Sequence, residues 1–131
     1  MASEATPVEQ SMKKGSASLA RRLNQRASVE EVVLEQQVLM CKAFANATRL
    51  HILELLGRRN WIAGELQKEL GISKANLSQH ITVLKTAGVI VRRREGKRVY
   101  FVLAMPEVKQ ACQLIRSMLR TRIQKGGRFF M

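Results

Sequence analysis

The chain has 131 residues, 46% of them apolar, which is enough for one compact domain with its own core. It contains no apolar run near the roughly 20 residues of a membrane-spanning helix, and its first residues, MASEATPVEQSMKKGS, lack the apolar segment of a secretory signal. These absences favour a cytoplasmic protein that has no membrane partner. The formal net charge of +13 comes from 23 Lys and Arg against 10 acidic residues, all of them Glu.

The positive charge is concentrated toward the C-terminus. Residues 91–131 carry eleven basic and only two acidic side chains. A field of this sign suits a polyanion, either nucleic acid or an anionic membrane surface. Charge alone does not distinguish such a partner from an ordinary basic surface that keeps a protein soluble, so the order of the local motifs has to decide.

The first ordered element is predicted to begin at Ser28. Residues 1–27 are rich in Ser, Ala, Lys, Arg and Gln without periodicity, and we expect a flexible basic tail there. Ser28 and Glu31 have the spacing of a capping box, which starts a helix that runs to about Phe44. A second helix follows the capping residue Asn46, and Gly57 is expected to end it in the left-handed conformation.

Two short helices joined by a tight turn follow a brief apolar strand at residues 60–64. The first is predicted over residues 63–70 and ends at Gly71. Ser73 is a second capping residue, and the next helix is predicted over residues 74–87, ending before Gly88. This arrangement is the helix-turn-helix pattern.

After Gly88 the hydrophobic period changes from that of a helix to that of a strand. Residues 89–94 and 98–103 are predicted to form a hairpin around a Glu95-Gly96-Lys97 turn. Pro106 begins a last helix that extends to about Gln124, and residues 126–131 form a short tail. The apolar residues of each element share one face: Val99, Phe101 and Leu103 in the strand, and Val108, Cys112, Ile115, Leu119 and Ile123 in the helix.

This order of elements predicts a mainly α fold with a small β-hairpin, a winged helix-turn-helix. Residues 28–125 would form its single DNA-binding and dimerisation domain. The helix over residues 74–87 has an inward stripe of Leu77, Ile81 and Leu84 and an opposite side of short neutral groups: Ala75, Asn76, Ser78, Gln79 and Thr82. A side of this kind can enter a major groove and contact base edges, while Lys74 near the helix start favours a phosphate.

The hairpin carries the second basic element. Arg92, Arg93, Arg94, Lys97 and Arg98 cluster there with only Glu95 against them. A run of charge is usually a solvated surface. Directly after a helix-turn-helix, however, it is typical of a wing whose side chains lie along phosphates or enter a minor groove.

The stretches KAFANATRLHILELL and ELQKELGISKANLSQHITVLKTAGVIVRRREGKRVYFVL resemble the ArsR/SmtB family of bacterial repressors. The resemblance covers about Val38 to Leu103. It implies a transcriptional repressor that binds operator DNA as a homodimer built from the first and last helices. It also implies operator contacts at Ser78, Gln79 and His80, whereas Ala75 stands where the family often has a polar residue.

The metal sites of that family are not matched by ligand residues here. The positions that correspond to one site are Met105, Glu107, Met118 and Thr121, which offer a single zinc ligand of the usual kinds. The other site needs a pair of thiols in a segment that corresponds to residues 61–66, which contain none. We therefore expect no metal and no cofactor.

The two cysteines, Cys41 and Cys112, leave two interpretations open. Some members of the family sense persulfides or oxidants through an early and a late thiol, and Arg116, one turn after Cys112, would lower the pKa of that thiol. In those sensors, however, the early cysteine lies further along the chain. The other interpretation is that both are buried small apolar residues, the commoner fate of a free cysteine.

Other classes of function fit the sequence less well. The chain has no Asp, both histidines lie in or beside the helix-turn-helix, and no nucleophile–base arrangement or Gly-rich phosphate loop is present, so we expect no enzyme. A non-specific architectural DNA-binding protein remains an alternative. A basic protein on a membrane surface is another, because the chain ends in Arg128-Phe129-Phe130-Met131.

Overall fold

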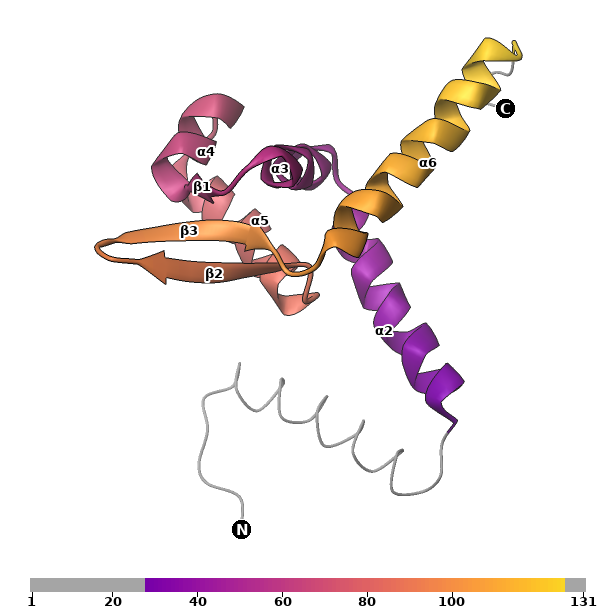
Figure 1. Ribbon diagram of the computed structural model, residues 1–131, viewed down its shortest axis with the longest axis horizontal. Coiled ribbons are helices and arrows are strands. Elements are labelled where there is room, and N and C mark those ends of the chain that lie inside the picture. Colours follow the sequence, from indigo (N-terminus) through magenta and orange to yellow (C-terminus); the bar gives the residue numbers. More distant parts are fainter. Residues whose placement is uncertain (1–27, 127–131) are drawn as a thin grey trace. The chain divides into compact units, whose positions relative to one another are not determined.

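The computed structural model describes residues 28–126 (Figure 1). The tail expected at residues 1–27 and residues 127–131 of the expected C-terminal tail lie outside the described residues. The elements in chain order are α2 (Val29–Phe44), α3 (Ala47–Arg58), β1 (Trp61–Ile62), α4 (Ala63–Leu70), α5 (Lys74–Thr86), β2 (Ile90–Glu95), β3 (Arg98–Leu103) and α6 (Pro106–Gln124). The described residues belong to two units, which divide after Val38, and the hydrophobic core lies in the part after Val38.

Side-chain caps set the starts of three helices. Ser28 Oγ accepts a hydrogen bond from the Glu31 amide at 3.2 Å, and Ser73 Oγ accepts one from the Asn76 amide at 3.1 Å. The Asn46 Oδ1 atom accepts from the amide three residues later at 3.0 Å. Each cap satisfies an amide that has no partner within its helix, so the predicted starts of α2, α3 and α5 are confirmed.

The predicted end of α3 at Gly57 is wrong. The helix continues to Arg58, and Gly57 is not among the glycines with positive φ. A Cβ atom at Gly57 would lie 3.4 Å from side-chain carbons of Lys109, so this glycine faces α6 at close range. The helix ends instead where Arg59 becomes extended while its amide still donates to the Leu55 carbonyl.

The three strands form one antiparallel sheet in the order β1-β3-β2. Glu95 pairs with Arg98, so the hairpin loop is the two residues Gly96 and Lys97, with Gly96 at φ 62°. The predicted loop was one residue too long. Ladder pairing continues up to the turn because a glycine at positive φ allows a two-residue connection.

The core lies between α3, α4, α5, the sheet and the start of α6. Its fully buried side chains are Ile52, Leu55, Leu66, Leu84, Val89 and Ile90. Strand β3 buries side chains on both faces: Phe101 lies on the predicted apolar face, and Val102 on the opposite face is buried as well. The end of α3 and the start of α6 lie beside the Val102 face, which explains the second buried side.

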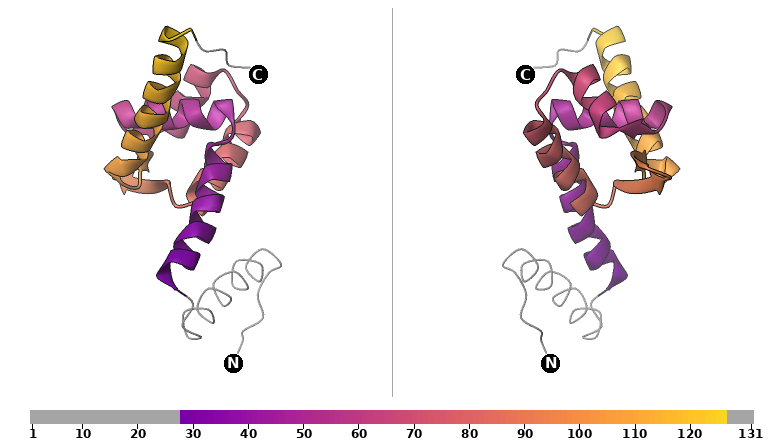
Figure 2. Two further views of the ribbon diagram at one scale, coloured as in Figure 1. Left: turned by 90° about the vertical axis from the view of Figure 1, so that its right-hand side faces the viewer. Right: turned by 90° about the vertical axis from the view of Figure 1, so that its left-hand side faces the viewer.

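The second half of α6 extends past this core, as two further views show (Figure 2). Of the stripe predicted for this helix, only Val108 and Cys112 are buried, whereas Ile115, Leu119 and Ile123 are exposed. Leu114 and Met118 beside them are each 64% exposed. On α2, Val29, Val33, Leu34, Val38 and Leu39 are exposed as well. Both helices therefore present apolar side chains that are exposed among the described residues.

Candidate nucleic-acid interface

Helix α5 is anchored by its inner side and by the turn that precedes it. Leu77, Ile81 and Leu84 are buried, as the sequence predicts. Gly71 ends α4 with φ 65°, and its amide donates to the Gln67 carbonyl at 2.9 Å. This tight turn holds α5 against α4 and the sheet, so its outer side has a fixed orientation.

The outer side of α5 is short and polar. The five expected contact residues other than His80 are all exposed: Lys74, Asn76, Ser78, Gln79 and Thr82. Thr82 Oγ1 donates to the Ser78 carbonyl at 2.8 Å, so this hydroxyl is partly occupied by its own helix. Within residues 28–126 the side-chain amides of Asn76 and Gln79 have no hydrogen-bond partner. Both can therefore pair with a base edge, which presents donors and acceptors at similar spacing.

His80 lies on one flank of α5 and has a partner inside the protein. Its ring is half-buried, and its Nδ1 atom lies 3.4 Å from Arg49 Nη1. Burial, and next the Arg49 guanidinium, hold the pKa of His80 below its ordinary value. A DNA contact by His80 stays a prediction. Nothing in the periodicity of the sequence pointed to Arg49.

The register of the hairpin divides the basic residues of the wing between two faces. Arg92 pairs with Phe101 and Arg94 with Val99, whereas Arg93 pairs with Tyr100. Paired residues share a face, and neighbours along a strand alternate. Arg92 and Arg94 therefore lie on the Phe101 face, and Arg93 and Arg98 on the Tyr100 face. The sequence suggested a single cluster, but the structure gives two.

A groove runs between α5 and β2. Its lining includes Lys74, Ser78, Thr82 and Lys85 of α5, Arg92 of β2 and Phe101 of β3. The lining includes three cations and no acidic side chain, so the groove suits a phosphate. The sequence interpretation missed Lys85. The spacing could have revealed it, because Lys85 is two turns after Ser78 on the same flank of α5.

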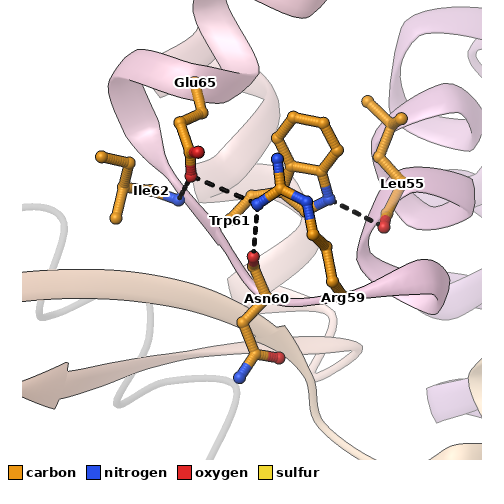
Figure 3. Close-up of polar contacts among 6 residues, drawn as sticks. All are labelled: Leu55, Arg59, Asn60, Trp61, Ile62 and Glu65. Carbon is orange, nitrogen blue, oxygen red and sulfur yellow. Dashed lines mark hydrogen bonds and ion pairs between the residues drawn. The ribbon is translucent and has the colours of Figure 1, made fainter.

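A clasp of polar contacts holds the start of the helix-turn-helix to the end of α3 (Figure 3). The Arg59 guanidinium lies 3.5 Å from the centre of the Trp61 ring, and Trp61 Nε1 donates to the Leu55 carbonyl at 2.9 Å. Glu65 Oε1 accepts from the Ile62 amide at 3.1 Å and from Arg59 at 3.3 Å. The amide, and next Arg59, hold the pKa of Glu65 below its ordinary value. The clasp thus positions α4 against the edge strand β1.

Known proteins resemble the chain in sequence. A family of helix-turn-helix domains matches residues 44–93. Rv0081 of Mycobacterium tuberculosis, an uncharacterised HTH-type transcriptional regulator, is 37% identical over 79 residues, 60% of this chain and 69% of that protein. The activator HlyU of Vibrio cholerae is 37% identical over 78 residues, which cover 60% of this chain and 72% of HlyU. The repressor SdpR of Bacillus subtilis is 39% identical over 62 residues, which cover 47% of this chain and 69% of SdpR.

Solved structures agree with these relatives. One is the winged helix-turn-helix DNA-binding domain of Mb0332 from Mycobacterium bovis, a homodimer in its solution structure and a possible ArsR-family regulator. It superposes on this chain with a TM-score of 0.66 at 28% sequence identity, and the match covers 71% of this chain and 86% of that domain. The crystal structure of Rv0081 has a TM-score of 0.66 at 31% identity, and the match covers 71% of this chain and 94% of Rv0081. The chain belongs to the ArsR/SmtB family. It is a DNA-binding transcriptional regulator with a winged helix-turn-helix fold.

The thiols of this ArsR/SmtB protein lie in different environments. Cys41 is exposed and Cys112 is buried, and both are free. Burial raises the pKa of Cys112, and although Arg116 lowers it as expected, the effect of burial is larger and the net shift is upward. The Arg116 guanidinium also lies 3.7 Å from the Glu54 carboxylate.

Residues 28–126 contain no group of three or more His, Cys, Asp or Glu placed to hold a metal. None of the helices in the same range is long and apolar enough to cross a membrane.

Proposed function

We propose that the chain is a cytoplasmic homodimeric repressor that recognises a palindromic operator in duplex DNA, with residues 28–125 as its DNA-binding and dimerisation domain. The observation that carries this proposal is the exposed outer side of α5, fixed by its buried stripe and flanked by a cationic groove. Asn76, Ser78, Gln79 and Thr82 would contact base edges in the major groove.

Phosphate contacts would flank the base contacts on both sides of the groove. Lys74, Lys85 and Arg92 line the groove between α5 and β2 and would hold the near backbone. On the wing, Arg93, Arg94, Lys97 and Arg98 are exposed and would follow the adjacent backbone or minor groove. His80 would add a donor at the edge of α5.

The dimer would be formed by the uncovered apolar surfaces of α6 and α2. Five large apolar side chains of α6 after Cys112 are exposed: Leu114, Ile115, Met118, Leu119 and Ile123. A second copy of the same helix would bury this stripe, and the homodimeric structure of Mb0332 supports such an assembly. Two recognition helices about 34–36 Å apart would then reach successive major grooves.

Repression is the proposed direction of control, since a dimer bound over a promoter excludes polymerase without any further contact. The relatives include both an activator and a repressor, so the direction has to be measured. A reporter driven by the promoter of the protein's own gene should become more active when the gene is deleted. A fall in reporter activity on deletion would contradict repression and indicate activation.

The binding proposal is tested by fluorescence anisotropy at fixed salt. The probes are the duplex upstream of the protein's own gene and a scrambled duplex of the same composition. We expect a preference of roughly a thousandfold for the first. Equal affinities with a steep salt dependence would instead identify an architectural DNA-binding protein. Flotation with anionic vesicles tests the membrane alternative, and we expect the protein to remain in the unbound fraction.

For Cys112 we propose packing rather than sensing, because this thiol is buried and its pKa is raised. The expectation of a buried Cys41 is wrong, because Cys41 is exposed on α2 and does not serve as a core residue. Binding measured in dithiothreitol and again after polysulfide treatment should then agree. A loss of binding on treatment that is absent in Cys112→Ser would overturn this assignment and identify a thiol-switched regulator.

A further inference from the structure

Arg49, in the first turn of α3, contacts three groups at once. Its Nε atom donates to the Ala43 carbonyl at 2.7 Å, and its Nη2 atom donates to the Lys42 carbonyl at 3.2 Å. Its Nη1 atom lies 3.4 Å from Nδ1 of His80 on α5. The two carbonyls belong to the last turn of α2, where helix carbonyls lack intrahelical partners and a cation is favoured.

This contact is the one side-chain polar link from α5 to another helix within residues 28–126. The remaining anchors of α5 are the apolar residues Leu77, Ile81 and Leu84, which resist separation but set rotation about the helix axis less strictly than a directional hydrogen bond. Beside Arg49, moreover, residues of α2 and α5 line a cleft instead of packing closely, among them Leu39, Lys42, Val83 and Thr86. The guanidinium therefore bridges two helices that are not in close contact there.

The chemistry of the pair also fixes the protonation of the imidazole. An arginine side chain only donates hydrogen bonds, so the His80 Nδ1 atom must present its lone pair to Arg49. The proton of the neutral ring then resides on Nε2, at the other edge of the ring. Among the described residues Nε2 has no partner, so it is available as a donor.

We propose that Arg49 is a positioning residue for DNA recognition, which fixes α5 against the last turn of α2 and orients the His80 Nε2–H toward DNA. The inference rests on the proposed function, because α2 would contribute to the dimer interface. A rigid connection from the last turn of α2, at Lys42 and Ala43, to α5 in each protomer would then help to set the distance between the two recognition helices, and hence the preferred half-site spacing.

The contact itself is tested without DNA by ¹⁵N–¹H spectra of the two histidines, assigned with His51→Gln. We expect His80 as the Nε2–H tautomer with a lowered pKa. In Arg49→Met the pKa of His80 should rise and the tautomer preference should weaken, because the donor at Nδ1 is gone. An unchanged tautomer and pKa in Arg49→Met would overturn the link.

The consequence for recognition is tested on duplexes whose half-sites are moved apart or together by one and two base pairs. Wild type should prefer one spacing. Arg49→Met and His80→Leu should each reduce that preference by about tenfold, the worth of one charge-assisted hydrogen bond. His80→Asn keeps an acceptor near the Nδ1 position but loses the Nε2–H, so it should retain the spacing preference and weaken all spacings alike.

The variants separate a positioning role from a merely structural one. His80→Leu leaves the cap of α2 intact, so the test remains decisive if Arg49→Met does not fold. A spacing preference preserved in both variants, with only the free energy of unfolding reduced, would show that Arg49 is a helix cap alone. A wild-type protein without any preferred duplex would instead contradict the proposed function, while the spectra would still report on the Arg49–His80 contact.

Discussion

Helices α5 and α6 have similar apolar stripes in sequence, but the two stripes differ in how far they are buried in the structure. The stripe of α5 is buried within the protomer, and its other side is short and polar. The stripe of α6 is buried only at Val108 and Cys112, and its second half is exposed. An apolar stripe thus predicts that a helix has a partner without saying whether the partner belongs to the same chain. The polar side of each helix is what distinguishes their roles.

The largest expected effect is on the buried stripe of α5. Leu84 is fully buried, and Leu84→Ala should lower the free energy of unfolding by about 2–5 kcal/mol, because it removes buried methyl groups and leaves a cavity. Urea unfolding followed by circular dichroism measures the change. Ile115→Ala on α6 is the matched control and should have a smaller effect in dilute protein, where the monomer predominates. If both variants lost the same free energy of unfolding at low protein concentration, the stripe of α6 would be as important for the fold of the monomer as the stripe of α5.

The second prediction concerns the exposed stripe of α6. Met118→Glu places a charge in the middle of the proposed interface, and it should raise the dimer dissociation constant by about a hundredfold or more. Sedimentation velocity over a range of concentrations reports the change. Gln124→Glu adds the same charge on the polar side of α6 and should leave assembly intact. A dimer that tolerates Met118→Glu would place the interface elsewhere.

The third prediction separates the outer side of α5 from its cationic flank. Gln79→Ala should cost about 1–3 kcal/mol on the preferred duplex and little on a scrambled one, because it removes a base contact. Lys85→Ala should weaken both duplexes alike and reduce the salt slope by about one, because it removes a phosphate contact. Anisotropy titrations at several salt concentrations distinguish the two patterns. If both variants lost affinity for the two duplexes in the same way, the assignment of Gln79 to base contacts and Lys85 to phosphate contacts would be wrong.

The smallest expected effect is a pH dependence of stability that arises from His80. In the folded protein the pKa of His80 lies below its ordinary value of 6.5, which applies in the unfolded chain. As the pH falls, His80 is therefore protonated in the unfolded chain before it is protonated in the folded protein. The free energy of unfolding should therefore decrease below about pH 6.5. Arg49 is the charged side chain in the described region that disfavours the protonated ring. His80→Gln should flatten the profile, whereas His51→Gln, at an exposed position, should preserve it.

Local signals allowed most element boundaries to be predicted from the sequence. Ser28, Asn46 and Ser73 cap helices through bonds to amides three residues away, and Gly71 ends a helix through its own conformation. Such signals act within a few neighbours, so they can be identified without a fold. Gly57 shows their limit: it was expected to stop α3, but its small size is used for the approach of α6, a contact 52 residues away in sequence that only the folded chain reveals.

The candidate site was predicted in its residues more than in its arrangement. The exposed side of α5 follows from helical spacing alone. The division of the wing does not, because it depends on which face of the hairpin meets α5. The link between Arg49 and His80 joins residues 31 positions apart, and no periodic pattern encodes it. At Cys112 the nearby Arg116 was anticipated, but the cost of burying a thiolate, which outweighs it, appears only once the core is formed.

The two-residue turn of the hairpin limits how the wing can change in evolution. Its ladder is continuous from Ile90 and Leu103 to the last pair, Glu95 and Arg98. A single-residue insertion in β2 would move every later side chain to the opposite face, exchanging the arginines directed at the α5 groove with those directed away from it. Lengthening by one residue in each strand would keep all existing pairs. Related wings should therefore differ in length by matched additions to both strands, and unpaired insertions should be confined to the tip.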